Sequence, residues 1–293
     1  MAEEARLEAL ALPIFAVLML AEAVVSTLRG KPAYEWRDFG GSMSQLAMNI
    51  GVKLGVDLFV VGLHIFLYQY RVFDFSHGPF NWIVTLVVLD FVFYGYHRAS
   101  HRSRFLWAAH VVHHSSERMN FGTALRQSPT GPLTRALFYW PLPLLGFDPV
   151  VIASAGAVAT IYGFWTHTEQ IKRLPRFLDW LFVSPADHRV HHGSNPEYID
   201  RNYANLLIIW DHLFESFEPE VAPVRYGLLK NIETFNPLRI GFAEWRSLLR
   251  DMFLSASLTE AWHHWIDPPD QSHLSRTRGD QRTHSINEPT QAN

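Results

Sequence analysis

Half of the sixteen histidines in the chain fall into three short clusters whose spacing suits metal binding. Residues three or four apart on a helix project from the same face, so each cluster can direct two imidazoles toward one point. Adjacent histidines point in different directions, so an HH pair can give one ring to each of two metals. The clusters are His97 and His101, then His110, His113 and His114, and finally His188, His191 and His192.

Eight imidazoles are too many for a single metal ion. A tetrahedral zinc takes four ligands, whereas eight to ten nitrogen ligands suit a two-metal centre. Imidazole accepts zinc, copper, iron or nickel, so the ligand type alone leaves the metal open. The chain has no cysteine, which excludes disulfides, thiolate zinc sites, iron–sulfur clusters and a cysteine nucleophile.

Long apolar runs precede the clusters and would have to position them. Residues 8–28 form a run about as long as the roughly 20 residues that cross a bilayer core, which we interpret as a retained span. Further apolar runs cover about 52–70 and 80–96, and a Pro- and Gly-interrupted run over 136–165 predicts a hairpin of two shorter helices. The expected fold is an all-α integral membrane protein, with four to five transmembrane or hairpin helices and a cytosolic helical cap that holds the di-metal site.

Charge patterning predicts an orientation and a domain division. Lysine and arginine occur in residues 29–43, 97–135 and 172–176, whereas 71–79 has only Arg71. The positive-inside rule therefore places the histidine clusters on the cytoplasmic side of a bacterial inner membrane or the endoplasmic reticulum.

A net charge of -3 without a long basic run argues against nucleic acid as a partner. We expect N-terminal membrane helices over 1–79, a catalytic domain over 80–255 and a disordered polar tail over 267–293.

Three charged positions within or near the apolar runs have alternative interpretations. Asp90 lies two helical turns before His97 and inside an apolar span, where a carboxylate suggests a functional site. Its role is either to accept a hydrogen bond from a ligand imidazole or to pair with a neighbouring helix. Glu22 is expected near the membrane interface or facing another helix, and Lys53 is expected to pair with Asp57 one turn later.

The three clusters, in this order and after an apolar span, resemble the fatty acid hydroxylase/sterol desaturase superfamily of membrane di-iron oxidases. The finer resemblance is to the alkylglycerol monooxygenases and their bacterial relatives. It covers roughly residues 40–220. It rests on HVVHHSSE (110–117), TALRQS (123–128), WTHTE (165–169) and the long segment 188–220 that begins HRVHHGSNPEY.

This resemblance implies a non-heme centre of two iron ions that uses O2 to attack an unactivated C–H bond of a lipid in the bilayer. In the alkylglycerol monooxygenases the attacked carbon adjoins an ether oxygen, and the external electron donor is tetrahydrobiopterin. No cytochrome b5 domain is present in the sequence, so electrons would come from an external donor. The implied iron ligands are the eight clustered histidines together with one more: His97, His101, His110, His113, His114, His167, His188, His191 and His192.

The resemblance also suggests roles for residues beside the histidines. Asp90 and Glu117 become candidate orienting groups for ligands, and Thr123 and Arg126 become candidate contacts for a lipid headgroup. Asp187 is interpreted as a helix cap or a surface carboxylate. Arg102 follows the second histidine of the first cluster, where the animal enzymes have an acidic residue. The remaining histidines are left outside the site: His64, His77, His212, His263, His264, His273 and His284.

Two alternatives stay open. The same superfamily contains sterol and fatty-acyl hydroxylases and desaturases, which the clusters alone do not separate from an ether-lipid hydroxylase. A metal transporter or metal-binding membrane protein is the second alternative. Transporters place ionisable ligands at mid-membrane, whereas these clusters lie at the ends of spans and in polar segments, which argues against that class.

Overall fold

The computed structural model describes residues 2–75 and 78–269, and over these residues it is helical, with two isolated β-bridges and no strand. The all-α prediction is therefore confirmed; the polar tail 270–293 and His77 lie outside the described residues. The helices are α1 (Ala2–Leu28), α2 (Trp36–Tyr68), α3 (Pro79–Arg102), α4 (Arg104–His114), α5 (Phe121–Ala124), α6 (Gly131–Tyr139), α7 (Pro141–Leu145), α8 (Pro149–Trp165), α9 (Arg176–Asp179), α10 (Pro185–His191), α11 (Ile209–Leu213), α12 (Pro237–Phe253) and α13 (Leu258–Ile266).

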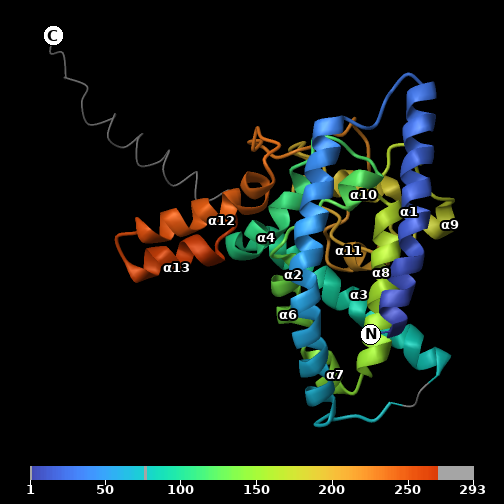
Figure 1. Ribbon diagram of the computed structural model, residues 1–293, viewed down its shortest axis with the longest axis vertical. Helices are drawn as coiled ribbons and strands as arrows, with labels where there is room; N and C mark the ends of the chain where they lie inside the picture. The colour runs from blue at the N-terminus through green and yellow to red at the C-terminus, as the bar shows by residue number, and fades with distance from the viewer. Residues whose placement is uncertain (1, 76–77, 270–293) are drawn as a thin grey trace.

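Three helices are long and apolar enough to cross a membrane: α1 over Ala11–Leu28, α2 and α3. In Figure 1, α1 and α2 run along the long axis of the molecule. Large apolar side chains such as Leu20, Leu58 and Phe59 lie exposed on them, as expected for helices whose solvent is lipid. The protein is an integral membrane protein. In Figure 1 the helices α4 and α11 lie near the middle of the long axis, and α10 lies closer to the end where α1 leads into α2.

Two predicted helix boundaries differ from the structure. The helix that becomes apolar at about Val52 was expected to follow a loop over 29–43, but it begins within those residues, at Trp36. Glu35 caps it there by accepting hydrogen bonds from the backbone of Arg37 and Asp38. The run over 136–165 was expected to form two helices, but it contributes to three: α6, α7 and α8. Gly146, at φ +107°, ends α7, and Asp148 caps the N-terminus of α8.

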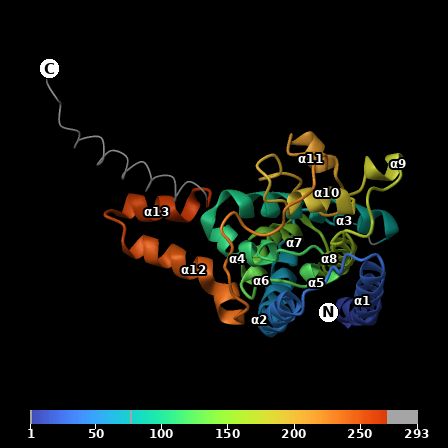
Figure 2. The ribbon, with the colours of Figure 1, turned by 90° about the horizontal axis from the view of Figure 1, so that it is seen from above.

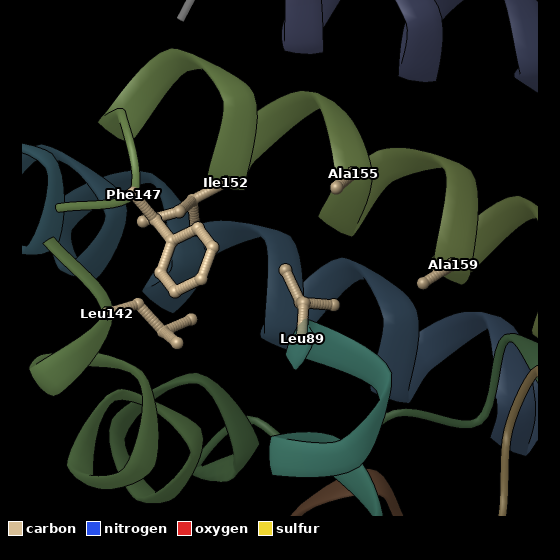
Figure 3. Close-up of a cluster of buried hydrophobic side chains, with 6 residues drawn as sticks. All are labelled: Leu89, Leu142, Phe147, Ile152, Ala155 and Ala159. Atoms are coloured by element: carbon tan, nitrogen blue, oxygen red, sulfur yellow. The ribbon is translucent and has the colours of Figure 1, made fainter. Parts of the chain in front are cut away.

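A buried apolar cluster fixes the two helices that lead to the histidines (Figure 3). Leu89 of α3 packs against Ile152, Ala155 and Ala159 of α8, and the cluster is closed by Leu142 and Phe147. The small alanine side chains let the backbones of α3 and α8 approach closely. His97 and His101 lie on α3, and His167 follows α8 by two residues, so this packing sets the distance between two parts of the site.

Two charged residues inside the apolar segments, Lys53 and Glu22, have partners within the protein. The Nζ of Lys53 lies 2.6 Å from Oδ2 of Asp57, which confirms the predicted pair. Glu22 faces other segments of the protein: its carboxylate accepts hydrogen bonds from the Tyr34 hydroxyl at 2.6 Å, the Phe121 backbone at 2.8 Å and the Thr168 hydroxyl. Glu22 thereby ties α1 to the segments on either side of the histidine site.

Candidate metal centre

All nine histidines expected in the site converge in the structure, and they form two groups. Within each group one nitrogen from every residue lies within 4.8 Å of the corresponding nitrogens of the others. All nine are buried except His110, which is half-buried. Group 1 comprises His97, His101, His110, His114 and His191; group 2 comprises His113, His167, His188 and His192.

Adjacent histidines are divided between the two groups. His113 belongs to group 2 and His114 to group 1, and the third cluster divides in the same way between His192 and His191. This follows from helix geometry, because neighbouring side chains on α4 diverge while those four residues apart align, as His110 and His114 do. The helices α4 and α10 each contribute to both groups, so the two groups lie beside each other.

The nitrogens that face one another are close. In group 1 the Nε2 atom of His110 lies 2.9 Å from Nε2 of His97 and 3.0 Å from Nε2 of His114. In group 2 the Nε2 atom of His188 lies 2.9 Å from Nε2 of His167 and 3.2 Å from Nε2 of His192. Two lone pairs that face each other over about 3 Å repel, and either a shared proton or a bound cation removes that repulsion. The donor set, its burial and its inward direction therefore fit two metal ions.

Backbone carbonyl groups fix the tautomer of three of these imidazoles. The Nδ1 atom of His97 donates to the carbonyl oxygen of Tyr203 at 2.6 Å, and Nδ1 of His191 donates to that of Arg201 at 3.0 Å. In group 2, Nδ1 of His167 donates to the carbonyl oxygen of Gly163 at 2.7 Å. A proton held at Nδ1 leaves the Nε2 lone pair free and directed into the group, as a metal ligand requires.

The electrostatics of the site favour neutral imidazoles. Burial lowers the pKa of His114 and His188 well below the usual value of 6.5, and neighbouring imidazoles lower it further. Burial also lowers the pKa of His167 to about 4. The neutral ring is the form that binds metal ions, so protons compete weakly for these nitrogens near neutral pH.

Asp90 does not orient a ligand imidazole, so that interpretation was wrong. Its buried carboxylate accepts hydrogen bonds from the backbone N–H groups of Leu206 and Leu207, each at 3.0 Å, and from Nε1 of Trp210 at 2.9 Å. These hydrogen bonds fit the other interpretation of Asp90, in which its carboxylate pairs with a neighbouring part of the fold. Asp90 therefore joins α3 to the loop that follows Tyr203, and it affects His97 only through that loop.

Thr123 and Arg126 are both buried and engaged within the protein. The Thr123 hydroxyl donates to the carbonyl oxygen of Arg118 at 2.8 Å. Arg126 donates through Nε to the Ser115 hydroxyl at 2.9 Å and forms an ion pair with Asp38 at 3.0 Å. These contacts join the start of α2 to the end of α4, and the contact of either side chain with a lipid headgroup stays a prediction.

The two acidic residues near the clusters differ from each other. Glu117 is exposed to solvent, so the structure does not place it against a ligand. Asp187 is a helix cap, as predicted, but it is buried rather than on the surface: it exchanges hydrogen bonds with Ser184 in a capping box at the start of α10. Burial raises the pKa of Asp187 to about 6.

The segment 200–203 was missed by sequence reasoning, although it contacts three histidines of group 1. Besides the carbonyl groups of Arg201 and Tyr203, it places the carboxylate of Asp200 3.6 Å from Nδ1 of His101. Asp200 and Asn202 have positive φ angles, of 60° and 53°. Asp and Asn adopt this left-handed conformation more readily than other non-glycine residues, which is the signal that the sequence contained.

These features define an all-helical membrane protein with a histidine-rich, two-metal type of site. Residues 82–216 match the family model of the fatty acid hydroxylases, a range that holds all nine histidines. The resemblance to the fatty acid hydroxylases that the sequence indicated is therefore confirmed over residues 82–216.

Several characterised proteins are similar to the chain over a longer range. The alkylglycerol monooxygenase of Homo sapiens is 40% identical over 235 residues, which cover 79% of this chain and 52% of that protein. The alkylglycerol monooxygenase of Danio rerio is 40% identical over 237 residues, with the same coverage of 79% and 52%. The ornithine lipid hydroxylase OlsE of Rhizobium tropici is 34% identical over 145 residues, which cover 49% of this chain and 44% of that protein.

The chain spans about half the length of the alkylglycerol monooxygenases that it matches. No solved structure matches it.

Proposed function

We propose that the protein is a membrane-bound, non-heme di-iron oxidoreductase that hydroxylates a lipid with O2, and that the lipid is an ether lipid, as the name alkylglycerol monooxygenase implies for its relatives. The observation that carries the proposal is the convergence of nine histidines, eight buried and one half-buried, into two adjacent groups at the ends of apolar helices. The similarity to alkylglycerol monooxygenases over 79% of the chain supports the substrate class.

The nine histidines would hold the two irons, five ligands in group 1 and four in group 2. Bound iron would supply the activation of O2 and the oxidation of a C–H bond. The protein's own contribution is to keep the imidazoles neutral and oriented. The carbonyl groups of Gly163, Arg201 and Tyr203 hold three rings by Nδ1, and burial keeps bulk water from the ligand atoms.

The lipid would reach the site from the bilayer, because α3 carries an apolar span directly into His97 and His101. In the proposed orientation the histidine groups face the cytoplasm, in keeping with the lysine and arginine distribution of the sequence. Electrons would come from an external donor, with tetrahydrobiopterin as the candidate implied by the resemblance. No side chain of the chain is assigned to bind this donor.

A second candidate is a hydroxylase or desaturase of another lipid, such as a sterol, a fatty-acyl chain or an amino-acid-containing lipid. The similarity to an ornithine lipid hydroxylase over 49% of the chain favours this candidate. The metal centre serves either substrate, because the outcome depends on which C–H bond is held beside it.

The test is lipid mass spectrometry on membranes from cells grown under 18O2 that express either the native chain or His191→Ala. A labelled product found only with the native chain, and derived from an ether lipid, is the expected result. A labelled non-ether lipid would select the second candidate. Loss of two hydrogens without label would indicate a desaturase. Identical lipids in the two cultures, with the native protein iron-loaded and supplied with ether lipid and tetrahydrobiopterin, would contradict the proposal.

A further inference from the structure

The helical hairpin formed by α12 and α13 projects sideways from the bundle, as Figures 1 and 2 both show. Several of its apolar side chains are not covered by the rest of the described chain. At the turn between the helices, Phe253 is 88% exposed, Leu254 is 72% exposed and Leu258 is 91% exposed. Exposed apolar side chains gathered at one projecting point indicate a surface that contacts something other than water.

The exposed side chains of α12 form two parallel rows. One row is apolar and consists of Leu238, Phe242, Leu249 and Phe253. Beside it, about 60° further around the helix at 100° per residue, lies a row of three exposed arginines: Arg239, Arg246 and Arg250. An apolar stripe bordered by basic side chains is the pattern of a helix that lies in the plane of a membrane interface.

The acidic residues of α12 face the protein and not the apolar row. Glu244 and Asp251 form ion pairs with the buried Arg104 at the start of α4, at 2.7 and 3.0 Å. Of the exposed arginines, Arg250 also reaches Asp251, at 3.2 Å, while its side chain stays 60% exposed. The exposed charge beside the apolar row of α12 is therefore basic, which complements lipid phosphates.

The start of the hairpin is tied to α2, and its end is tied to the start of α4. At the start of α12, Nε2 of Gln45 donates to the carbonyl oxygen of Pro237 at 2.7 Å. At the end of α13, the backbone N–H of Arg104 donates to the carbonyl oxygen of Asp267 at 3.0 Å. Gln45 follows the charged first turn of α2 and precedes exposed apolar residues such as Leu58. The hairpin thus leaves the bundle where α2 changes from polar to lipid-facing.

We propose that the α12–α13 hairpin lies in the membrane interface as an in-plane anchor. Its apolar row and its turn enter the acyl region, and the three arginines contact lipid phosphates. The exposed Trp262 and the partly exposed Trp265 of α13 suit the same depth, where indole rings are enriched. The occupant of this surface is the lipid bilayer that already surrounds α1, α2 and α3.

Because the chain contains no cysteine, a single nitroxide label tests the depth of each position directly. Leu249→Cys and Leu258→Cys are labelled in the full chain, in nanodiscs of phosphatidylcholine and phosphatidylglycerol. Collision rates are measured with O2, which partitions into lipid, and with a water-soluble nickel chelate. Leu58→Cys on α2 serves as the lipid reference, and Lys230→Cys, on an exposed loop, serves as the water reference. All four positions are exposed, so the substitutions leave packing intact.

The expected result is an O2-to-nickel ratio at positions 249 and 258 severalfold above that at position 230 and approaching that at position 58. A ratio equal to that at position 230 would overturn the proposal, because the face would lie in water. Low collision rates with both reagents, together with dipolar broadening between protomers, would also overturn it in favour of a second copy of the chain. The variant R239Q/R246Q/R250Q should lower the ratio at position 258; an unchanged ratio would overturn the role of the arginine row.

Discussion

The Nδ1 atom of His97 donates a hydrogen bond to the carbonyl oxygen of Tyr203 over 2.6 Å, although the two residues are 106 positions apart. The Tyr203 ring also packs beside two further histidines of group 1, with its centroid 5.3 Å from that of His101 and 6.1 Å from that of His191. One residue of an irregular segment therefore orients one candidate ligand and confines two others.

The side chain of Asn202 holds this segment in place. Its Nδ2 donates to the carbonyl oxygens of Asp187 and Glu218, at 3.1 and 2.8 Å, and its Oδ1 accepts from the backbone N–H of Glu218 at 2.8 Å. Asn202→Asp keeps the shape but directs a carboxylate oxygen at two carbonyl oxygens. We expect iron affinity to fall by about 10- to 100-fold, as is typical when the partners of ligands are disturbed.

The measurement for this prediction is the iron content of purified protein after timed exposure to a chelator. Asn236→Asp is the matched control, since Asn236 caps α12 and aspartate caps helices equally well. Iron retention by Asn202→Asp equal to that of the native chain would show that the segment does not position the ligands.

Removal of one histidine from each group should be equally damaging to function. His191→Ala takes a ligand from group 1 and His113→Ala takes one from group 2, and a two-metal reaction requires both. We expect each variant to remain in the membrane, to bind less iron and to lose activity. His264→Ala, on α13 and outside both groups, should match the native chain. Activity retained in both ligand variants would contradict the di-iron proposal, and an inactive His264→Ala would show that the site is larger.

The spacing of the histidines in the sequence indicated the site, because residues one turn apart on a helix project their side chains in the same direction. His97 and His101, and likewise His188 and His192, meet in one group as residues one helical turn apart must. His167 was found only by resemblance, since a lone histidine after an apolar helix has no spacing partner. The position of its ring depends on the packing of α8 against α3, which is a tertiary contact.

The orienting groups were harder to predict for a physical reason. Three of the imidazoles are held by backbone carbonyl oxygens, which every residue possesses, so the sequence contains no chemical signal for them. Asp90 was conspicuous as a carboxylate within an apolar span, yet its partners are backbone N–H groups of a loop far along the chain. Arg126 was likewise visible as a charge, while its burial against Asp38 required the fold.

Metal-free protein should lose stability as the pH falls, because burial lowers the pKa values of His110, His114 and His192 below the unfolded value near 6.5. Below that pH the unfolded chain binds protons that the folded chain does not, so the free energy of unfolding decreases. The expected slope is about 1.4 kcal/mol per pH unit for each such histidine. Above the unfolded pKa the effect vanishes.

Thermal unfolding in detergent, followed by tryptophan fluorescence between about pH 8 and pH 5, measures this dependence. Iron-loaded protein is the control, and it should hold its melting temperature to a lower pH, because protons must first displace the metal. A metal-free sample whose melting temperature does not change below pH 6.5 would contradict the lowered pKa values.

Arg104 should be a strong determinant of stability and of the position of the α12–α13 hairpin. Its guanidinium is only 1% exposed and pairs with Glu244 and Asp251 of α12. Arg104→Met leaves Glu244 without its cation and Asp251 with the exposed Arg250, and breaking a buried pair from one side costs about 3–5 kcal/mol. Arg102→Met is the control: that side chain is 53% exposed and lies 3.7 Å from Asp200, so its loss should cost under about 1 kcal/mol. Urea unfolding in detergent compares the two variants. Equal losses in the free energy of unfolding would show that the burial of Arg104 does not increase its contribution to stability.

The mobility of a nitroxide at position 258 provides a second measurement. It should increase in Arg104→Met only, since α12 is then released from α4.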